Sequence, residues 1–230
     1  MTTTLITGAN KGLGLETARA LLELGHDVWV GARDPDRGEQ AARDLGARFV
    51  RIDVTDDASV SHAAATLERE GGLDVLVNNA GIAGGRTPVP EVTVDDLRAI
   101  YETNVFGLVR VTQAFVPLLL RSGGPVIVNV SSGMGSLAVT TDPTRLESSI
   151  VGLAYPSSKT AVNMLTSQYA KAYPQIRVNA VDPGYTATDL NGHRGTQTVA
   201  EGARAIVRAA CLANDGPTGS FLDAAGRVPW

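Results

Sequence analysis

Two residues one helical turn apart, Tyr155 and Lys159, have side chains that can move a proton. Tyrosine is a poor acid–base group at its ordinary pKa of about 10, so nearby positive charge has to favour the phenolate. Lys159 lies on the same face of a predicted helix, and its ammonium, together with the charge of an oxidised nicotinamide, is suited to that role. Such a pair can protonate an alkoxide as hydride reaches a carbonyl carbon, or run the reverse step on an alcohol.

A serine hydroxyl can complete this arrangement by holding the same substrate oxygen. Residues 129–133 read Asn-Val-Ser-Ser-Gly at the end of an apolar run, and they offer Ser131 and Ser132. The residue types alone do not indicate which of the two serines holds the substrate oxygen. The alternative for the whole set is structural: the tyrosine packs, the lysine is a surface charge and the serines only end a strand.

A glycine-rich turn near the amino terminus is suited to a dinucleotide. Residues 7–14 read Thr-Gly-Ala-Asn-Lys-Gly-Leu-Gly and join an apolar run to a helical pattern. Glycine allows a phosphate to approach the backbone closely, and the helix amino terminus offers free N–H groups and the positive end of its dipole. A Walker loop is not present, because no Gly-Lys is followed by Ser or Thr. The loop residues predicted to contact the dinucleotide are Gly8, Asn10, Lys11, Gly12, Leu13 and Gly14.

The end of the second predicted strand, Gly-Ala-Arg-Asp at residues 31–34, indicates which dinucleotide is used. An acidic residue there binds the ribose 2′-hydroxyl of NAD, whereas an arginine accepts the 2′-phosphate of NADP. Arg33 and Lys11 supply two cations, and a guanidinium can grip a phosphate through two parallel hydrogen bonds. We therefore expect NADP(H), with NAD(H) bound through Asp34 as the alternative.

These motifs, in this order, resemble the short-chain dehydrogenase/reductase family over nearly the whole chain. The glycine spacing is Gly-x-x-x-Gly-x-Gly, Asp-Val follows the third predicted strand, Asn-Asn-Ala-Gly follows the fourth and Tyr-x-x-x-Lys follows the fifth. The Asn-Lys pair of the glycine loop and the Ala-Arg-Asp segment are similar to the carbonyl reductases of that family.

The resemblance implies roles for individual residues. It places the catalytic serine at Ser132, lets Lys159 bind the ribose, and gives Asn104 a water that links the lysine to solvent. It also implies that the Pro-Gly segment from residue 183 embraces the nicotinamide, although Thr186 stands where the family often has valine. The further residues that it places on the cofactor are Asp53, Val54, Asn79, Ala80, Gly81, Tyr155, Lys159, Pro183, Gly184, Thr186 and Thr188.

The elements that must position these residues alternate along the chain. The predicted strands are residues 3–7, 27–31, 48–52, 73–78, 125–130 and 176–181, with a short seventh at 219–223. The predicted helices are residues 13–24, 35–45, 58–70, 94–120, 157–173 and 199–213. The strands are apolar without alternation, which indicates helices on both faces of a parallel sheet. We predict an α/β single-domain Rossmann fold over residues 1–230, with a doubly wound sheet of about seven strands and its ligands at the carboxyl edge.

Two polar stretches interrupt this pattern and are predicted to be loops. Residues 133–154 separate Ser132 from Tyr155 by more than the usual family spacing, so we predict an insertion whose part 140–149 faces solvent. Residues 185–198 are the expected substrate lid. These segments and the loop 82–90 would form the substrate pocket. Because they carry no charged cluster suited to a phosphate or carboxylate, we expect small or medium apolar aldehydes or ketones as substrates.

Composition excludes several other classes of protein. The chain has 230 residues, 43% hydrophobic and 19% charged, with a net charge of −4, which fits neither disorder nor a nucleic-acid partner. A single cysteine and the lack of a leader or long apolar stretch predict a cytoplasmic protein without a membrane anchor. The three histidines lack ligand spacing, so no metal is expected. The resemblance favours a homo-oligomer, while the insertion leaves a monomer open.

The function expected from these residues is an NADP(H)-dependent oxidoreductase acting on a carbonyl or alcohol substrate. One alternative is a non-catalytic NADP sensor, against which the intact Ser132, Tyr155 and Lys159 argue. The other is a sugar-nucleotide epimerase or dehydratase that uses its cofactor transiently. Little of the chain is left beyond the sheet to bind such a substrate.

Overall fold

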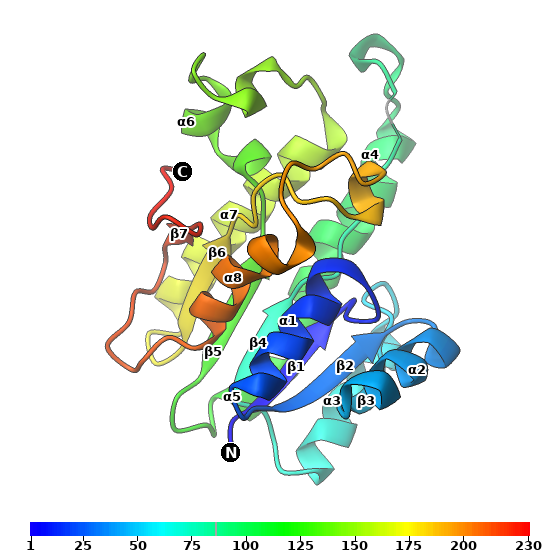
Figure 1. Ribbon diagram of the computed structural model, residues 1–230, viewed down its shortest axis with the longest axis vertical. Coiled ribbons are helices and arrows are strands. Elements are labelled where there is room, and N and C mark those ends of the chain that lie inside the picture. The colour runs from blue at the N-terminus through cyan, green and yellow to red at the C-terminus, as the bar shows by residue number, and fades with distance from the viewer. Residues whose placement is uncertain (86) are drawn as a thin grey trace.

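Seven parallel strands form one sheet in the order β3-β2-β1-β4-β5-β6-β7 (Figure 1). The structure is a computed structural model, and it describes residues 1–85 and 87–230. The strands are β1 Thr3–Thr7, β2 Asp27–Ala32, β3 Arg48–Arg51, β4 Val75–Asn78, β5 Val126–Val130, β6 Arg177–Val181 and β7 Phe221–Leu222. The strand order reverses between β1 and β4, and ligands of such sheets bind at the carboxyl ends beside this reversal. The predicted doubly wound Rossmann sheet is confirmed.

Helices cover both faces of the sheet, as the continuous apolar strands predicted (Figure 1). One face carries α1 Gly12–Glu23, α2 Pro35–Leu45 and α8 Val199–Ala210, and the other carries α3 Asp57–Arg69, α4 Val94–Tyr101, α5 Gly107–Leu119 and α7 Ala154–Ala172. Successive strand residues supply the two cores in turn: Leu5 packs under α3, α5 and α7, while Ile6 packs under α1, α2 and α8. No helix of the described ranges is long and apolar enough to cross a membrane.

The predicted helix at residues 94–120 is interrupted by a π-helical turn, Glu102–Phe106. Its start follows the sequence, because Thr93 and Asp96 form a capping box at the amino end of α4. The extra residue of a π turn changes which side chains face the sheet, and such turns occur mostly at functional sites. Here the turn contains Asn104, so the long helix was predicted in extent but not in geometry.

The polar stretch 133–154 was predicted as a loop, and that prediction is partly wrong. It contains a 3₁₀ turn at Gly133–Gly135, the short helix α6 Leu137–Thr140 and a second 3₁₀ turn at Leu146–Ser149. The helix α7 begins at Ala154 rather than residue 157, which places Tyr155 in its first turn. Residues 143–146 are exposed, as expected of an outward-facing segment.

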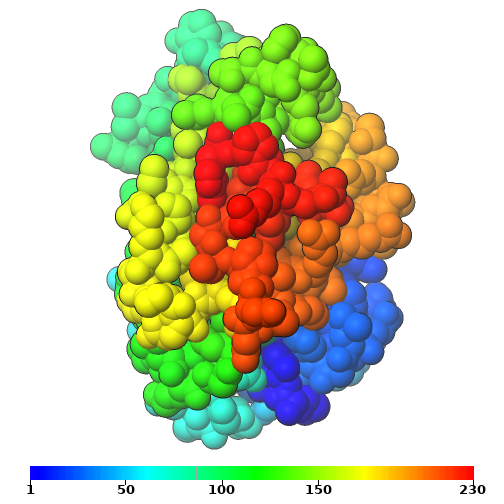
Figure 2. All heavy atoms as spheres, turned by 90° about the vertical axis from the view of Figure 1, so that its left-hand side faces the viewer, coloured from blue at the N-terminus to red at the C-terminus, as the bar shows by residue number. Residues whose placement is uncertain are grey.

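The carboxyl-terminal residues pack against this insertion, as Figure 2 shows from the side of β7. The rings of Trp230 and Phe221 stack with their centroids 5.6 Å apart. The carbonyl of Trp230 accepts a hydrogen bond from the N–H of Ala138 at 3.1 Å, and the carbonyl of Pro229 accepts one from Ser136 Oγ at 2.7 Å. The last strand and the tail thus fix the start of the insertion.

Phe115 of α5 lies at the centre of the core under α3, α5 and α7 and has no exposed surface. Phe115→Ala is expected to lower the free energy of unfolding by about 3–5 kcal/mol, because the cavity left behind cannot close fully. Urea denaturation followed by circular dichroism measures this change. Phe106→Ala is the matched control: that ring is 50% exposed, so its loss should cost less than about 1 kcal/mol. Equal losses in both variants would contradict this description of the core.

Candidate active site

Ser132, Tyr155 and Lys159 meet at the carboxyl end of β5. The strand ends at Val130 and delivers Ser132 two residues later, while the first turn of α7 brings Tyr155 above it. The Ser132 hydroxyl lies near the Tyr155 hydroxyl and lowers its pKa. The Lys159 ammonium donates to the carbonyl of Val130 at 2.8 Å and lies 5.7 Å from the centroid of the Tyr155 ring. The structure therefore brings these three predicted residues together.

Asn104 joins this group through the loop that follows β4. Its Oδ1 accepts from the backbone N–H of Ile82 at 2.9 Å, and its Nδ2 donates to the carbonyl of Ile82 at 2.9 Å and to Ser158 Oγ at 3.0 Å. A Cβ atom on Gly81 would lie 3.3 Å from Asn104 Oδ1 and 3.6 Å from Lys159 Nζ. Gly81, Asn104 and Lys159 are thus neighbours, and Ser158 is a partner that sequence reasoning missed.

The charges of the pair differ from the sequence expectation. Burial lowers the pKa of Lys159 to about 8, since the residue is only 5% exposed. Burial also raises the pKa of Tyr155 to about 12, partly opposed by the nearby Ser132 hydroxyl and reinforced by the charge of Asp182. The sequence predicted a lowered tyrosine pKa in the presence of the Lys159 ammonium and an oxidised nicotinamide, whereas in the protein alone burial raises the pKa of Tyr155.

The glycine loop has the backbone that its sequence predicted. Gly8 and Gly12 have positive φ angles of 65° and 55°, which favour glycine. A Cβ atom on Gly14 would lie 2.6 Å from Asn79 Nδ2 and 2.7 Å from the carbonyl oxygen of Gly8. Lys11 is the N-cap of α1 without a side-chain cap bond, and the first turn of this fully described helix holds no acidic residue. Its N–H groups are therefore available to an anion.

The loop is held in place by the segment after β4. Asn79 Nδ2 donates to the carbonyls of Thr7 at 2.8 Å and Gly8 at 3.2 Å. Thr7 Oγ1 accepts from the backbone N–H groups of Asn79 and Ala80, both at 3.0 Å. Asn79 and Ala80 thus act on the glycine loop directly. Thr7 was missed by sequence reasoning, although a threonine that ends an otherwise apolar strand was a signal for it.

At the end of β2, Arg33 and Asp34 are the two residues that could bind the ribose 2′ position of the dinucleotide, and their surroundings differ. Asp34 caps α2: its Oδ1 accepts from the N–H of Arg37 at 3.1 Å, and its Oδ2 lies 3.5 Å from Arg37 Nε. Arg33 is exposed and forms no ion pair with another residue that the structure describes. Asp34 is therefore committed to its helix, while Arg33 is free to bind a phosphate.

The residues after β3 lie beside this end of the sheet. Asp53 Oδ1 accepts from the N–H and the hydroxyl of Thr55 at 3.0 and 2.8 Å, which shapes the turn. Val54 packs against Gly107 of α5, where a Cβ would come within 2.8 Å of Val54 Cγ2. Asp53 and Val54 thus border the predicted adenosine side of the site and lie away from the catalytic group.

The segment after β6 reaches back to the glycine loop. A Cβ atom on Gly12 would lie 3.8 Å from Thr188 Cγ2, and Lys11 Nζ forms an ion pair with Asp189 Oδ2 at 2.7 Å. Thr186 is buried, and its hydroxyl donates within its own turn to the carbonyls of Pro183 and Gly184 at 3.1 and 3.3 Å. The Thr186 side chain therefore stabilises the turn in which it lies.

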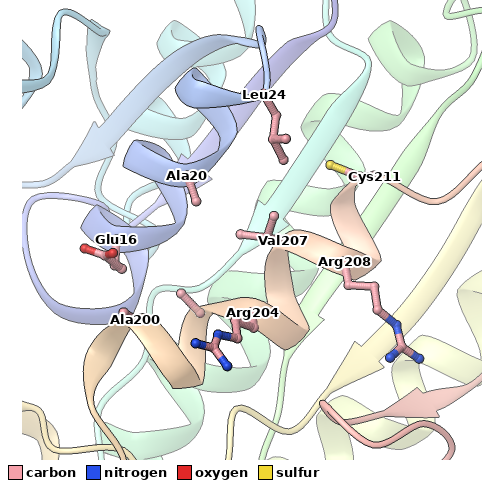
Figure 3. A pocket seen from close by; sticks show the side chains of 9 residues that line it. Glu16, Ala20, Leu24, Ala200, Arg204, Val207, Arg208 and Cys211 are labelled. Atoms are coloured by element: carbon pink, nitrogen blue, oxygen red, sulfur yellow. The ribbon is translucent and has the colours of Figure 1, made fainter.

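A separate groove of about 300 Å³ runs between α1 and α8 (Figure 3). None of the predicted site residues lines it, and it opens on the outer side of the two helices. Its lining residues are Glu16, Ala20, Leu24, Ala200, Ala203, Arg204, Val207, Arg208 and Cys211. Across the ranges that the structure describes, no group of three or more His, Cys, Asp or Glu side chains could hold a metal ion.

The model of the short chain dehydrogenase family matches residues 2–198 of the chain. With the sheet order and the glycine loop, this match defines an oxidoreductase of the Rossmann fold, a class that binds a nicotinamide dinucleotide. More particularly, the chain belongs to the short-chain dehydrogenase family.

Named relatives agree with this assignment. A short-chain dehydrogenase of Penicillium roqueforti is 39% identical over 221 residues, with 90% of this chain and 87% of the relative covered. The (−)-isopiperitenone reductase of Mentha piperita is 34% identical over 298 residues, with 95% of each chain covered. That alignment is longer than this chain, so the mint enzyme carries segments without a counterpart here. The NADPH-bound carbonyl reductase from chicken fatty liver superposes with a TM-score of 0.87 at 30% identity, covering 100% of this chain and 99% of that one.

Burial of Lys159 predicts an unusual dependence of stability on pH. The folded pKa of about 8 lies below the ordinary value of 10.5, so between these pH values the unfolded chain binds a proton that the folded one has lost. The free energy of unfolding of the wild type should rise across this window relative to Lys159→Met, by about 1 kcal/mol per pH unit. Below pH 8 the difference should stay constant.

Chemical denaturation at a series of pH values between 6 and about 10 measures this effect. Lys171→Met is the matched control, since Lys171 is exposed in the last turn of the same helix. A parallel pH dependence in wild type and Lys159→Met would show that the folded protein binds the Lys159 proton as tightly as the unfolded chain does.

Proposed function

We propose that the protein is a cytoplasmic reductase that transfers hydride from NADPH to small or medium apolar aldehydes and ketones. The observation that carries the proposal is the meeting of Ser132, Tyr155 and the buried Lys159 at the carboxyl end of β5. The same edge of the sheet carries the glycine loop and the free amino terminus of α1. A proton donor and an anion-binding turn at one sheet edge suit hydride transfer to a carbonyl.

NADPH is preferred over NADH because of the two side chains at the end of β2. Asp34 is engaged as the cap of α2 and paired with Arg37, whereas Arg33 is exposed and available to a 2′-phosphate. The similar carbonyl reductase from chicken was solved with NADPH bound. Lys11 adds a second cation once its exposed ion pair with Asp189 opens, and such exposed pairs contribute little.

In the proposed reaction the chain's own residues hold the carbonyl oxygen and supply the proton. Bound NADPH would provide the hydride. Ser132 donates to the oxygen that becomes an alkoxide, and the Tyr155 hydroxyl delivers its proton there. The Tyr155 phenol is protonated at neutral pH, as reduction requires, because its pKa lies well above 7. Lys159 holds the ribose, and the contact from Asn104 to Ser158 lies beside it as the start of a proton route to solvent.

Apolar side chains around the site support the choice of substrate. The insertion, the loop after β4 and the segment after β6 expose large apolar residues at the carboxyl edge of the sheet. Exposed apolar surface of this kind marks binding sites for apolar molecules. These residues are Ile82, Leu137, Leu146, Val151, Tyr185 and Leu190.

Consumption of NADPH tests the proposed reaction. The wild type is expected to oxidise NADPH in the presence of aldehydes, ketones or quinones, and Tyr155→Phe to lower kcat by roughly 10²–10⁴-fold, because the proton donor is lost. Absorbance of the reduced nicotinamide measures the rate. Tyr173→Phe, just after the far end of α7, is the control and should retain activity. Binding of NADPH without turnover of any substrate in the panel would favour a sensor instead.

The choice of dinucleotide is tested at Arg33. Arg33→Ala should raise the Kd for NADPH by roughly 10–100-fold, because a charged hydrogen-bond partner of the 2′-phosphate is lost. Binding of NADH should change little. Fluorescence titration of both dinucleotides measures this, with Arg43→Ala, an exposed residue in the last turn of α2, as the control. An equal loss for NADH and NADPH would count against Arg33 as the phosphate ligand.

A further inference from the structure

Asn163 is a buried amide of α7 that takes no direct part in the proposed reaction. It lies one turn beyond Lys159, on the same face of the helix, and only 4% of it is exposed. Its Nδ2 donates to the carbonyl of Gly135 at 3.1 Å, and its Oδ1 accepts from Ser131 Oγ at 2.6 Å. This one amide therefore binds the residue before Ser132 and a residue shortly after it.

The Ser131 end of this bridge is fixed to the sheet. The N–H of Ser131 donates to the carbonyl of Val181 at 2.7 Å, so the backbone before Ser132 stays paired with the segment of β6. Only 2% of Ser131 is exposed, and its hydroxyl is engaged by the amide of α7. Ser132 is less deeply buried. The bridge thus occupies the first serine of the pair and leaves the second for a substrate oxygen.

The turn after β5 sets the direction in which Ser132 donates. Ser132 is the N-cap of the 3₁₀ turn, and its Oγ accepts from the N–H of Met134 at 3.2 Å. Its carbonyl accepts from the N–H of Gly135 at 2.8 Å. A hydroxyl has one hydrogen to donate and two lone pairs that accept. With one lone pair taken by Met134, the hydrogen of Ser132 remains available to a substrate oxygen.

This turn is packed tightly between α7 and two carboxylates. A Cβ atom on Gly135 would lie 2.6 Å from the carbonyl carbon of Lys159. A Cβ atom on Gly133 would lie 2.7 Å from Glu147 Oε1 and 3.0 Å from Asp182 Oδ2. Glycine permits this close packing, but it leaves two residues of the turn without a side chain that could anchor them. The hydrogen bond from the amide of α7 supplies an anchor.

We propose that Asn163 is a positioning residue that holds the Ser132 hydroxyl at the distance from Tyr155 that carbonyl reduction requires. Tyr155 lies in the first turn of the same helix, so an amide that ties the Ser132 turn to α7 keeps the two hydroxyls at a fixed separation. In the reaction both hydroxyls serve one substrate oxygen, the first as a hydrogen-bond donor and the second as the source of the proton. The catalytic role rests on the proposed function, whereas the bridge itself does not.

A double-mutant cycle tests whether Asn163 acts through Ser132. Asn163→Leu keeps a similar side-chain size and removes both hydrogen bonds. It is expected to lower kcat by roughly tenfold or more, and by no more than the roughly 10²–10³-fold that loss of such a donor costs, with the Kd for NADPH unchanged. In a Ser132→Ala background it should lower kcat by less than about twofold, because the hydroxyl that it positions is already gone. Equal factors in both backgrounds, or an unchanged kcat in folded Asn163→Leu, would overturn the proposal.

Asn179→Leu is the matched control for loss of a buried amide. Asn179 of β6 has no exposed surface; its Nδ2 donates to the carbonyl of Pro217 at 2.7 Å, and its Oδ1 accepts from the N–H of Ser220 at 3.0 Å. Because these partners are not shared with the Ser132 turn, kcat should stay within about twofold of the wild type. A fall equal to that in Asn163→Leu would contradict the proposal.

A second variant covers the case in which thermal unfolding shows that Asn163→Leu is not folded. Ser131→Ala breaks the same bridge by removing a single hydroxyl, and it is carried through the same cycle with the same expected pattern.

The bridge is measured on the protein alone by amide hydrogen exchange. The N–H groups of Met134, Gly135 and Ser136 form hydrogen bonds inside the turn. In Asn163→Leu they should exchange roughly tenfold faster than in Asn179→Leu, because the tie to α7 is lost. Unchanged exchange in the folded variant would overturn the bridge. If the wild type turns over no substrate, the proposed function fails and the catalytic role with it, but the exchange rates still decide the bridge.

Discussion

A lysine ammonium buried between a helix and the end of a strand loses much of its hydration, and its N–H groups need acceptors inside the protein. Lys159 finds one in the carbonyl of Val130, the last residue of β5. Glycine lets the turn after Ser132 pack against this part of α7, because a Cβ atom on Gly135 would lie 2.6 Å from the Lys159 carbonyl carbon. The position of Tyr155, the π turn with Asn104 and the turn after Ser132 all surround this one buried charge.

A ladder of buried amides and hydroxyls supports the site from beneath. Asn78 Nδ2 donates to Asn129 Oδ1 at 2.9 Å and to Thr112 Oγ1 at 3.0 Å, and Asn129 Nδ2 donates to Thr166 Oγ1 at 2.9 Å. These bonds join β4 and β5 to α5 and α7 through the interior. Each contributes only about 1 kcal/mol net, but losing one partner leaves a buried polar group unpaired, which costs more. The ladder therefore fixes the helix that carries Tyr155 and Lys159 against the strand that precedes Ser132.

The sequence predicted the sheet well because its strands are short, apolar and separated by turn residues. The helix α2 was predicted at both ends, since Pro35 opens it and Gly46, at φ 71°, closes it. The π turn left no signal, because one extra residue in a long apolar helix keeps a helical pattern. The early start of α7 did leave a signal in the sequence. Proline is tolerated in the first turn of a helix, so Pro156 could have been placed inside α7.

Other features of the site depend on neighbours far apart in the chain. The separation of Asp182 from Glu147 in sequence gave no reason to place both beside Gly133. The raised pKa of Tyr155 follows from burial, which the spacing of Tyr155 and Lys159 does not reveal. Motifs thus predicted which residues meet at the candidate active site, while their electrostatics required the packed structure.

The contacts of residues 228–230 have a practical meaning for anyone who handles the protein. The Pro229 carbonyl accepts a hydrogen bond from Ser136, which lies only a few residues after Ser132, and Trp230 stacks on Phe221. Met1 lies at the opposite, amino-terminal edge of the sheet (Figure 1). A purification tag or reporter fused after Trp230 would therefore leave beside α6, and one fused before Met1 would leave from the far side of the molecule.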